Sequence, residues 1–540
     1  MEPNRRTGGA ARGLLRRHAS WFLVAAAYLV VSPYFERLNN PNENVRVWAT
    51  RAIVAHHVLN IDDVSREWGY VNDKAKNERH VYSSKAPGVS FLGVPVLAAE
   101  TGLRSLFGWP PPGKRATTFW LRLVAVKLPM LAFFWLFARW VERRTGSALA
   151  RDLLLVGLGL GTMLYPYGGM FVGHALAAAA AFAAFILIDD PRVDAPGPAD
   201  ARAVALRAAG AGLLAGLAVA LEYQVILVAA ALAVYVAVRR WRALLPFAAG
   251  ALPVAAALGA YHAALFGRPW TFPYAHIENP YFAATAHRAG FHGLALPDWG
   301  ALPVILFSPA YGLFAFSPVL LLGLAGAIFL AARGPRREAV LVLAVALSMF
   351  LFNAGMSNWR AGWCAGPRYI ASTVPFLLLP IVQLWPRLGR RAWLTAALVG
   401  LTIASVVLNV VTGALYPHYP EQYDNPVFDL ALPLLGAGYT PYGLGWLLGL
   451  RGVAAMAPLA LVVLAALALT AAGGDPRPRR AAAHLAAGLA IAAAFLLPLS
   501  AYGRAPRPAE AKATATVRSL WDPASGAPSG APRSDTRPAT

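Results

Sequence analysis

The sequence is poor in cysteine and in charged side chains. Its 540 residues include one cysteine, Cys364, so the chain can form no disulfide within itself and no cysteine-rich metal site. Only 14% of the residues are charged, whereas 58% are hydrophobic. The sequence also lacks a P-loop, a dinucleotide-binding fingerprint, a serine nucleophile elbow and an HExxH motif. The composition is that of a membrane protein.

The hydrophobic residues are gathered into long runs. A run of about twenty apolar residues can cross a bilayer core of roughly 30 Å as a helix, which satisfies its own backbone polar groups in hydrocarbon. We therefore expect an all-α polytopic membrane protein with a bundle of about 13 transmembrane helices. The expected spans lie near residues 20–34, 118–140, 152–168, 173–189, 204–221, 223–238, 244–265, 312–332, 339–355, 371–385, 392–414, 452–472 and 482–501.

The formal net charge of +22 follows from where the arginines lie. They cluster at the ends of apolar runs, as at Arg16 and Arg17 or at Arg143 and Arg144. Positive residues near the ends of spans resist translocation and mark cytoplasmic loops. We therefore expect a basic cytoplasmic N-terminus at 1–19, a multi-pass location in a bacterial inner membrane, and no nucleic-acid binding.

This topology makes the outer loops of the transmembrane domain, 20–501, long and polar. Functional residues are often found in such loops on a rigid scaffold, so we expect the active site to be extracytoplasmic. The segment 502–540 is rich in Pro, Ala, Ser and Thr and is expected to form a disordered extracytoplasmic tail. The expected outer loops are 35–117, 266–311, 356–370 and 415–450.

The first outer loop contains a short apolar stretch, Val89 to Phe107, which Pro95 interrupts. If this stretch crossed the membrane, Arg143 and Arg144 would lie outside, against the positive-inside trend. We therefore expect a juxtamembrane helix that lies in the interface rather than a span.

Glu43 directly follows the first expected span, in the segment NPNENVR that ends at Arg46. At the membrane surface, partial desolvation and the nearby Arg46 could tune this carboxylate to act as a general base. The alternative is a solvated loop acid without a catalytic role.

Lys85 lies further along the same loop, in the segment YSSKAPG before the interfacial stretch. A lysine at the start of a helix is well placed to hold a lipid phosphate, because the backbone N–H groups and the helix dipole add to its charge. The alternative is a lysine that anchors the chain at the membrane surface.

The outer loop at 356–370 departs from the positive-inside trend. It carries Arg360 and Arg368 among aromatic residues and glycines. A bound anion such as a phosphate would explain two arginines on the outer side. The rings could stack on a sugar face or form an interfacial belt; they are Trp359, Trp363 and Tyr369.

Other polar residues lie at the outer ends of expected spans. His174, Glu222 and Tyr223 could line the same cavity, although an interhelical hydrogen bond is the commoner explanation. The histidines and acids of the loop 266–311 fit no zinc-ligand spacing, so we expect no metal site there. A divalent cation at the active site stays an open alternative.

These features together resemble the GT-C superfamily of membrane glycosyltransferases, of the aminoarabinose transferase, protein O-mannosyltransferase and glycosyltransferase family 39 type. The resemblance covers most of the chain. It rests on the acid after the first span, on KAPG at Lys85 where relatives have KPP, on FVGH ending at His174, and on GPRY around Arg368.

The resemblance implies a GT-C-like fold and transfer of a sugar from a polyprenyl-phosphate donor to a lipid, glycan or protein acceptor on the outer face. It implies that Glu43 is the catalytic base and that Lys85 and Arg368 contact the donor phosphate. The partners would be this donor and membrane lipids. The remaining candidates for the substrate cavity are Arg46, His174, Glu222, Tyr223, Trp359, Arg360, Trp363 and Tyr369.

The chain departs from the family pattern where many relatives carry Asp or an Asp–Glu pair, because here the residues are Asn42 and Glu43. The base could therefore be Asp62 or Asp63 instead. Two other functions also fit a chain of this kind: a flippase or transporter, and a polymerase of lipid-linked saccharides.

Overall fold

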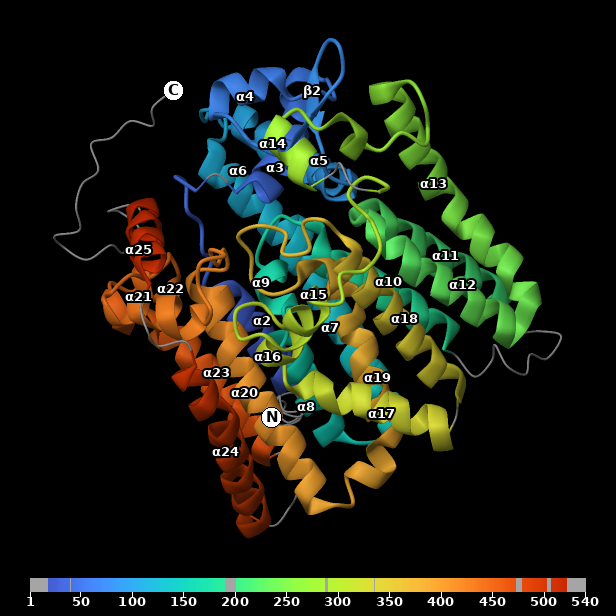
Figure 1. The fold of residues 1–540 in the computed structure, drawn as a ribbon, viewed down its shortest axis with the longest axis vertical. Coiled ribbons are helices and arrows are strands. Elements are labelled where there is room, and N and C mark those ends of the chain that lie inside the picture. The colour runs from blue at the N-terminus through green and yellow to red at the C-terminus, as the bar shows by residue number, and fades with distance from the viewer. Residues whose placement is uncertain are drawn as a thin grey trace, which may run out of the picture.

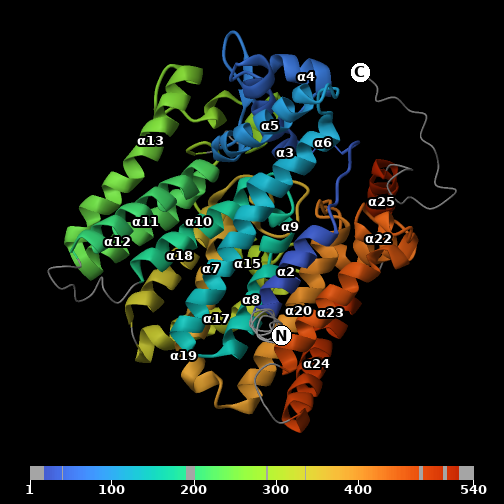
Figure 2. The same cartoon turned by 180° about the vertical axis from the view of Figure 1, so that it is seen from behind.

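The computed structural model describes residues 18–38, 40–189, 201–286, 290–334, 336–472, 478–502 and 507–521. In these ranges the chain is mainly helical, and its one sheet is a two-stranded antiparallel hairpin. Long helices form a bundle, and the elements of the first loop gather at one end of it (Figures 1 and 2).

The bundle begins at α2 and ends at α24. One helix runs without a break from α6 through a π-helical stretch, Leu121–Lys127, into α7. The helices of the bundle are α2 (Ala19–Val30), α6 (Lys114–Trp120), α7 (Leu128–Thr145), α8 (Ala148–Leu160), α10 (Gly173–Ile188), α11 (Ala201–Leu221), α12 (Ile226–Arg240), α13 (Leu244–Phe266), α17 (Val319–Arg333), α18 (Arg336–Gly355), α19 (Val374–Leu388), α20 (Ala392–Leu415), α23 (Ala457–Ala472) and α24 (Pro478–Ala501).

Shorter elements lie in the connections. The first loop contains α3 (Pro41–Arg51), α4 (Asp62–Trp68), β1 (Lys74–Lys76), β2 (Val81–Ser83) and α5 (Gly88–Leu106). The other short helices are α9 (Leu164–Gly168), α14 (Pro280–Ala286), α15 (Ala301–Phe307), α16 (Leu313–Phe316), α21 (Leu432–Gly436), α22 (Leu444–Leu447) and α25 (Pro508–Leu520).

The expected all-α polytopic membrane fold is confirmed. Eight helices of the described residues are long and apolar enough to cross a membrane, whereas α2, α10 and α17 are apolar but shorter. The number of about 13 spans stays a prediction. The eight are Lys114–Thr145, Ala201–Leu221, Tyr223–Phe266, Arg336–Gly355, Arg368–Leu388, Ala392–Leu415, Gly452–Thr470 and Ala482–Ala501.

The first loop is folded rather than extended. α3 begins where Asn40 caps it, with its side chain accepting a hydrogen bond from the Glu43 amide at 3.4 Å, and Pro41 fits the first helical position. Thr50 of α3 donates to the Ser90 carbonyl of α5 at 3.0 Å, so the two helices are fastened together. The interfacial position of α5 stays a prediction, and this helix is not among the eight candidate spans.

The expectation of a disordered tail is wrong for residues 507–521. The segment forms α25, because Pro508 starts the helix and Ala513, Val517 and Trp521 provide a buried apolar side. The composition of the segment did not reveal the helical spacing of these apolar residues, since Ala, Pro and Thr also dominate disordered segments. Of the predicted tail and N-terminus, residues 503–506, 522–540 and 1–17 lie outside the described residues.

Helices α11 and α13 pack backbone against backbone. A Cβ atom on Gly212 would lie 1.8 Å from the Phe247 carbonyl oxygen, and one on Gly250 would lie 1.8 Å from that of Ala209. Small residues allow membrane helices to approach this closely. The pair lies side by side in both views (Figures 1 and 2).

We expect Gly212→Ala to destabilise the protein by roughly 1–3 kcal/mol, because the added methyl group must push the two helices apart. Thermal unfolding of the purified protein in detergent measures this. Gly102→Ala in α5 is the matched control, because nothing lies within 4 Å of its Cβ position. Equal unfolding temperatures for Gly212→Ala and the wild type would contradict the packing described.

Candidate substrate cavity

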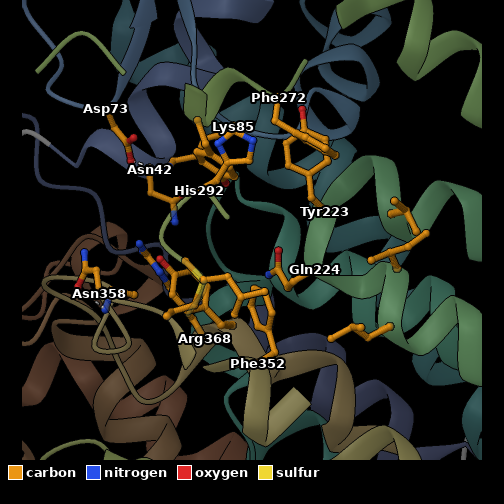
Figure 3. Close-up of a pocket in the computed structure, with 18 of the residues that line it drawn as sticks. Asn42, Asp73, Lys85, Tyr223, Gln224, Phe272, His292, Phe352, Asn358 and Arg368 are labelled. Carbon is orange, nitrogen blue, oxygen red and sulfur yellow. Dashed lines mark hydrogen bonds and ion pairs between the residues drawn. The ribbon is translucent and has the colours of Figure 1, made fainter. Parts of the chain in front are cut away.

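A cavity of about 1310 Å³ lies between the elements of the first loop and the helix bundle. Figure 3 shows Lys85 and Asp73 on one side of it and Arg368 and Asn358 on the other. The cavity is amphipathic: one part is polar, and the other has an apolar wall from four helices. That wall includes Ala215 and Val219 of α11, Ile226 of α12, Phe247, Val254 and Leu258 of α13, and Phe352 of α18.

Lys85 and Asp73 form an ion pair in the polar part. The hairpin β1–β2 brings them together, and Ser84 donates a hydrogen bond to the Asp73 carboxylate at 2.6 Å. Burial alone would raise the pKa of Asp73, but Lys85 lowers it below its usual value. Burial lowers the pKa of Lys85 despite its acidic partner, and Arg368 and Arg46 lower it further. The protonation of Lys85 therefore depends on the balance between Asp73, which favours the charged form, and burial and the two arginines, which oppose it.

Arg368 approaches the cavity from the bundle, at the start of a 3₁₀ turn, Arg368–Thr373. The loop before it turns at Gly362 and Gly366, whose φ values of 72° and 70° favour glycine. The Arg368 Nε atom is buried without a hydrogen-bond partner among the described residues, and no ion pair within them involves this side chain. An anion in the cavity could therefore accept a hydrogen bond from this guanidinium group.

Glu43 lies beside the cavity rather than on its wall. Its carboxylate accepts hydrogen bonds from Nε and Nη2 of Arg122, both at 2.6 Å, and from the Phe171 amide at 2.7 Å. Burial would raise the pKa of Glu43, but Arg122 and the Phe171 amide lower it below its usual value. The carboxylate is therefore ionised at neutral pH. The neighbouring Asn42 does line the cavity.

Arg46 and Glu222 form a second buried pair, with Nη2 of Arg46 2.8 Å from Oε1 of Glu222. Arg46 also donates to the Asn42 carbonyl at 2.7 Å, and His174 lies 3.4 Å from both Glu222 and Asn42. These contacts confirm none of the expected substrate roles, and they fit the commoner explanation of interhelical hydrogen bonds. The network joins α3, α10 and the end of α11.

The other predicted residues divide into two groups. Tyr223, Trp363 and Tyr369 line the cavity, and the Tyr223 hydroxyl lies 2.8 Å from Nε2 of His262. Trp359 and Arg360 do not line it. Their backbone carbonyl groups instead stabilise the conformation of the loop: that of Trp359 accepts a hydrogen bond from the Tyr311 hydroxyl, and that of Arg360 accepts one from the Cys364 thiol.

The two alternative bases lie away from the cavity. Asp62 accepts a hydrogen bond from the Val81 amide at 3.0 Å and pairs with His80 at 2.8 Å. Asp63 pairs with Arg66 one helical turn later. Both carboxylates therefore have local structural partners, and neither is among the residues that line the cavity.

Sequence reasoning missed several polar residues of the cavity, and the two most relevant to its chemistry are Asp73 and His418. Asp73 is the one carboxylate among the described residues that line the cavity. His418 is 8% exposed, and burial lowers its pKa to about 4, so the ring is neutral at neutral pH. Asp73 could have been found as an acid twelve positions before Lys85 across a hairpin, whereas nothing near His418 signalled its place. Within the described residues, no cluster of three His, Cys, Asp or Glu side chains could hold a metal ion.

No family model and no curated protein matches the chain. Among solved structures it is similar to ArnT from Cupriavidus metallidurans in the apo state, with 17% identity over 91% of this chain and 78% of that one, at a TM-score of 0.45. A second ArnT structure, bound to undecaprenyl phosphate, gives 17% identity over 92% of this chain and 78% of that one, at a TM-score of 0.43.

The chain is also similar to the arabinosyltransferase EmbB from Mycobacterium smegmatis, with 15% identity over 90% of this chain and 40% of EmbB, at a TM-score of 0.43. An oligosaccharyltransferase from Archaeoglobus fulgidus gives 13% identity over 84% of this chain and 55% of that one, at a TM-score of 0.41. These likenesses concern the path of the chain, and at such TM-scores they assign no function.

We expect Arg122→Met to destabilise the protein by about 3–5 kcal/mol, because it leaves the buried Glu43 carboxylate without its cation. The double variant Glu43→Gln/Arg122→Met removes the uncompensated charge and should recover part of this loss. Thermal unfolding of both variants in detergent provides the comparison. Equal stability of the single and double variants would show that the pair is not buried as described.

Proposed function

We propose that this chain is a membrane glycosyltransferase that moves a sugar from a polyprenyl-phosphate donor to an acceptor on the extracytoplasmic face. The observation that supports this proposal most is the amphipathic cavity, in which cationic side chains and an apolar helix wall line one continuous space. A polyprenyl-phosphate sugar has the same division into an anionic, hydroxylated head and a long apolar tail.

The apolar part of the cavity suits the isoprenoid tail. Its wall comes from α11, α12, α13 and α18, and the outer sides of α11 and α13 carry exposed leucines such as Leu213 and Leu252. Exposed apolar side chains on candidate spans are expected to face lipid. The tail could therefore pass from the bilayer into the cavity without crossing a polar surface.

The polar part suits the donor phosphate. Lys85 and Arg368 reach the cavity from opposite sides (Figure 3), so a phosphate between them would contact one ammonium and one guanidinium group. Arg368 has no acidic ion-pair partner among the described residues, whereas Lys85 would exchange its contact with Asp73 for the phosphate. Preorganised cations of this kind also stabilise the charge that develops on a departing phosphate.

The reaction is an inverting displacement at the anomeric carbon. A carboxylate takes the proton from an acceptor hydroxyl or amine, the acceptor atom forms a bond to the anomeric carbon, and the bond from that carbon to the phosphate oxygen breaks. The phosphate leaves with the electron pair, and no nucleotide is needed because the donor already contains an activated sugar.

We propose Glu43 as the base, with Asp73 as the competing carboxylate. Three hydrogen bonds keep Glu43 ionised and fix its orientation, but its pKa is lowered, which weakens a base. Asp73 lines the cavity, but it is paired with Lys85. A bound phosphate that draws Lys85 away would free Asp73, so the two carboxylates need a direct comparison.

The purified protein, incubated with a panel of polyprenyl-phosphate sugars, is expected to release the polyprenyl phosphate from at least one of them. With that donor, Glu43→Gln should lower turnover roughly 100-fold or more while donor binding is retained, since a general base contributes about that much. A smaller loss in Asp73→Asn would support Glu43, and the reverse order would transfer the role to Asp73. No release from any donor would contradict the proposed function.

Undecaprenyl phosphate should bind roughly tenfold more weakly to Arg368→Met and to Lys85→Met, because each variant loses a charged hydrogen bond. Arg360→Met is the matched control, because this arginine of the same loop does not line the cavity. The lowered pKa of Lys85 adds a pH dependence: the lysine loses its charge at a lower pH than a free lysine, so wild-type affinity falls as the pH becomes alkaline.

Tryptophan-fluorescence or native mass-spectrometry titrations of undecaprenyl phosphate at several pH values measure both effects. Lys85→Arg should remove the alkaline decrease, because arginine stays charged. An Arg360→Met variant as weak as Arg368→Met, or an unchanged alkaline decrease in Lys85→Arg, would overturn the assignment of the phosphate contacts.

A further inference from the structure

The helix α25 is anchored at its end by Trp521. The indole is 2% exposed and packs against Phe35, Tyr416 and Tyr439, with ring centroids 4.7, 5.6 and 5.5 Å away. Its Nε1–H donates to the Thr440 carbonyl at 3.3 Å. The last described residue of the chain is therefore built into the body of the protein.

Polar contacts fix the remainder of α25. The Tyr423 hydroxyl donates to the Glu510 carbonyl at 3.0 Å and lies 2.6 Å from the Thr514 hydroxyl. Arg507, the residue that precedes the first turn of α25, pairs with Asp424 at 2.9 Å. The helix is thus held along its length by the loop that follows α20.

Two residues of this helix, Thr516 and Leu520, line the cavity. Arg37 and Leu38 of the first loop line it beside them, and Arg37 donates to the Ser519 carbonyl at 3.3 Å. In both views α25 lies at the opposite side of the molecule from α13 (Figures 1 and 2). The cavity therefore extends from the apolar wall of α11 and α13 to α25.

The end of the cavity at α25 differs chemically from the apolar end. It offers hydrogen-bonding groups on Asn358, His418 and Thr516 and the ring of Trp363. Hydroxyl and amide groups suit the hydroxyl groups of a saccharide, and an aromatic face suits the apolar face of a sugar ring. Arg37, Leu38 and Leu520 also line this end, so its wall mixes polar and apolar groups.

This end also adjoins the reacting groups. His418 packs against Phe35 and Tyr416, the same rings that hold Trp521, with centroid distances of 6.5 and 5.8 Å. Two residues before Phe35, the Pro33 carbonyl accepts a hydrogen bond at 2.5 Å from Arg122, the partner of Glu43. An acceptor that enters past α25 therefore meets the side of the cavity where the Glu43–Arg122 pair lies.

We infer that the α25 end of the cavity is the acceptor subsite, that it takes a saccharide head group, and that Thr516 and Leu520 help to select this acceptor. The inference rests on the proposed function, since it divides one cavity between the two substrates. The donor occupies the end at α11 and α13, and the acceptor occupies the end at α25.

Photo-crosslinking of the full chain in cells tests this division. A benzophenone amino acid is placed at Leu520, at Val254 in the apolar wall, and at Ala515, an exposed residue of α25 that does not line the cavity. After irradiation, mass spectrometry of the purified protein should find a saccharide-containing adduct at position 520 and a polyprenyl-phosphate adduct at position 254. Position 515 should give neither above background.

The outcomes separate this inference from the proposed function. Absence of a polyprenyl-phosphate adduct at position 254 would overturn both, because the donor would not occupy the apolar end. With that adduct present, a peptide adduct, a polyprenyl-phosphate adduct or no saccharide adduct at position 520 would overturn the acceptor subsite alone. Leu520→Trp, which fills this end, should lower glycan transfer in cells at least tenfold without weakening undecaprenyl phosphate binding, whereas Ala515→Trp should match the wild type.

Discussion

The ion pair between Glu43 and Arg122 is the contact on which the rest of the site depends. Glu43 belongs to α3 in the first loop, Arg122 to the long helix that runs from α6 into α7, and the third donor, Phe171, precedes α10. Arg122 also binds the Pro33 carbonyl just after α2. One carboxylate and one guanidinium therefore join the chain around positions 33 and 43 to two segments distant in sequence, around 122 and 171, and they hold α3 over the bundle.

The position of α3 fixes the cavity beneath it. Asn42, next to Glu43, lines the cavity, and Arg46, one helical turn later, ties α3 to Glu222 at the end of α11. Two buried ion pairs in the first half of one short helix cost desolvation energy, and such pairs are weak arguments for stability. Their value here is geometric, because they set the distance between the loop that carries Lys85 and the bundle that carries Arg368.

Much of the fold could be predicted from the sequence because apolar runs and arginine clusters are local signals. The pattern predicted α11, α13 and α20 within a few residues, and it placed Lys85 and Arg368 among the candidates for one site. Composition misled at α25, where a real helical periodicity was hidden by Ala, Pro and Thr. It could not foresee the partners of Glu43 either, since Arg122 is 79 positions away and was counted as part of a span.

Long-range contacts explain the other differences. The sequence predicted that Trp359 and Arg360 bind a ligand. In the structure their backbone carbonyl groups accept hydrogen bonds that stabilise the loop carrying Trp363 and Arg368. His418 became visible only when the loop after α20 was placed around the cavity, whereas Asp73 could have been found from its spacing to Lys85 across the hairpin. Short motifs thus indicated some residues that line the cavity, such as Lys85 and Arg368, whereas its other walls depended on tertiary structure.

The most direct measurement of the central claim is a cryo-EM map of the purified chain with undecaprenyl phosphate. The account predicts density for the phosphate between Lys85 and Arg368, with the isoprenoid tail along α11 and α13 and no density at α25. A phosphate bound outside the cavity, or a tail that runs toward α25, would contradict it.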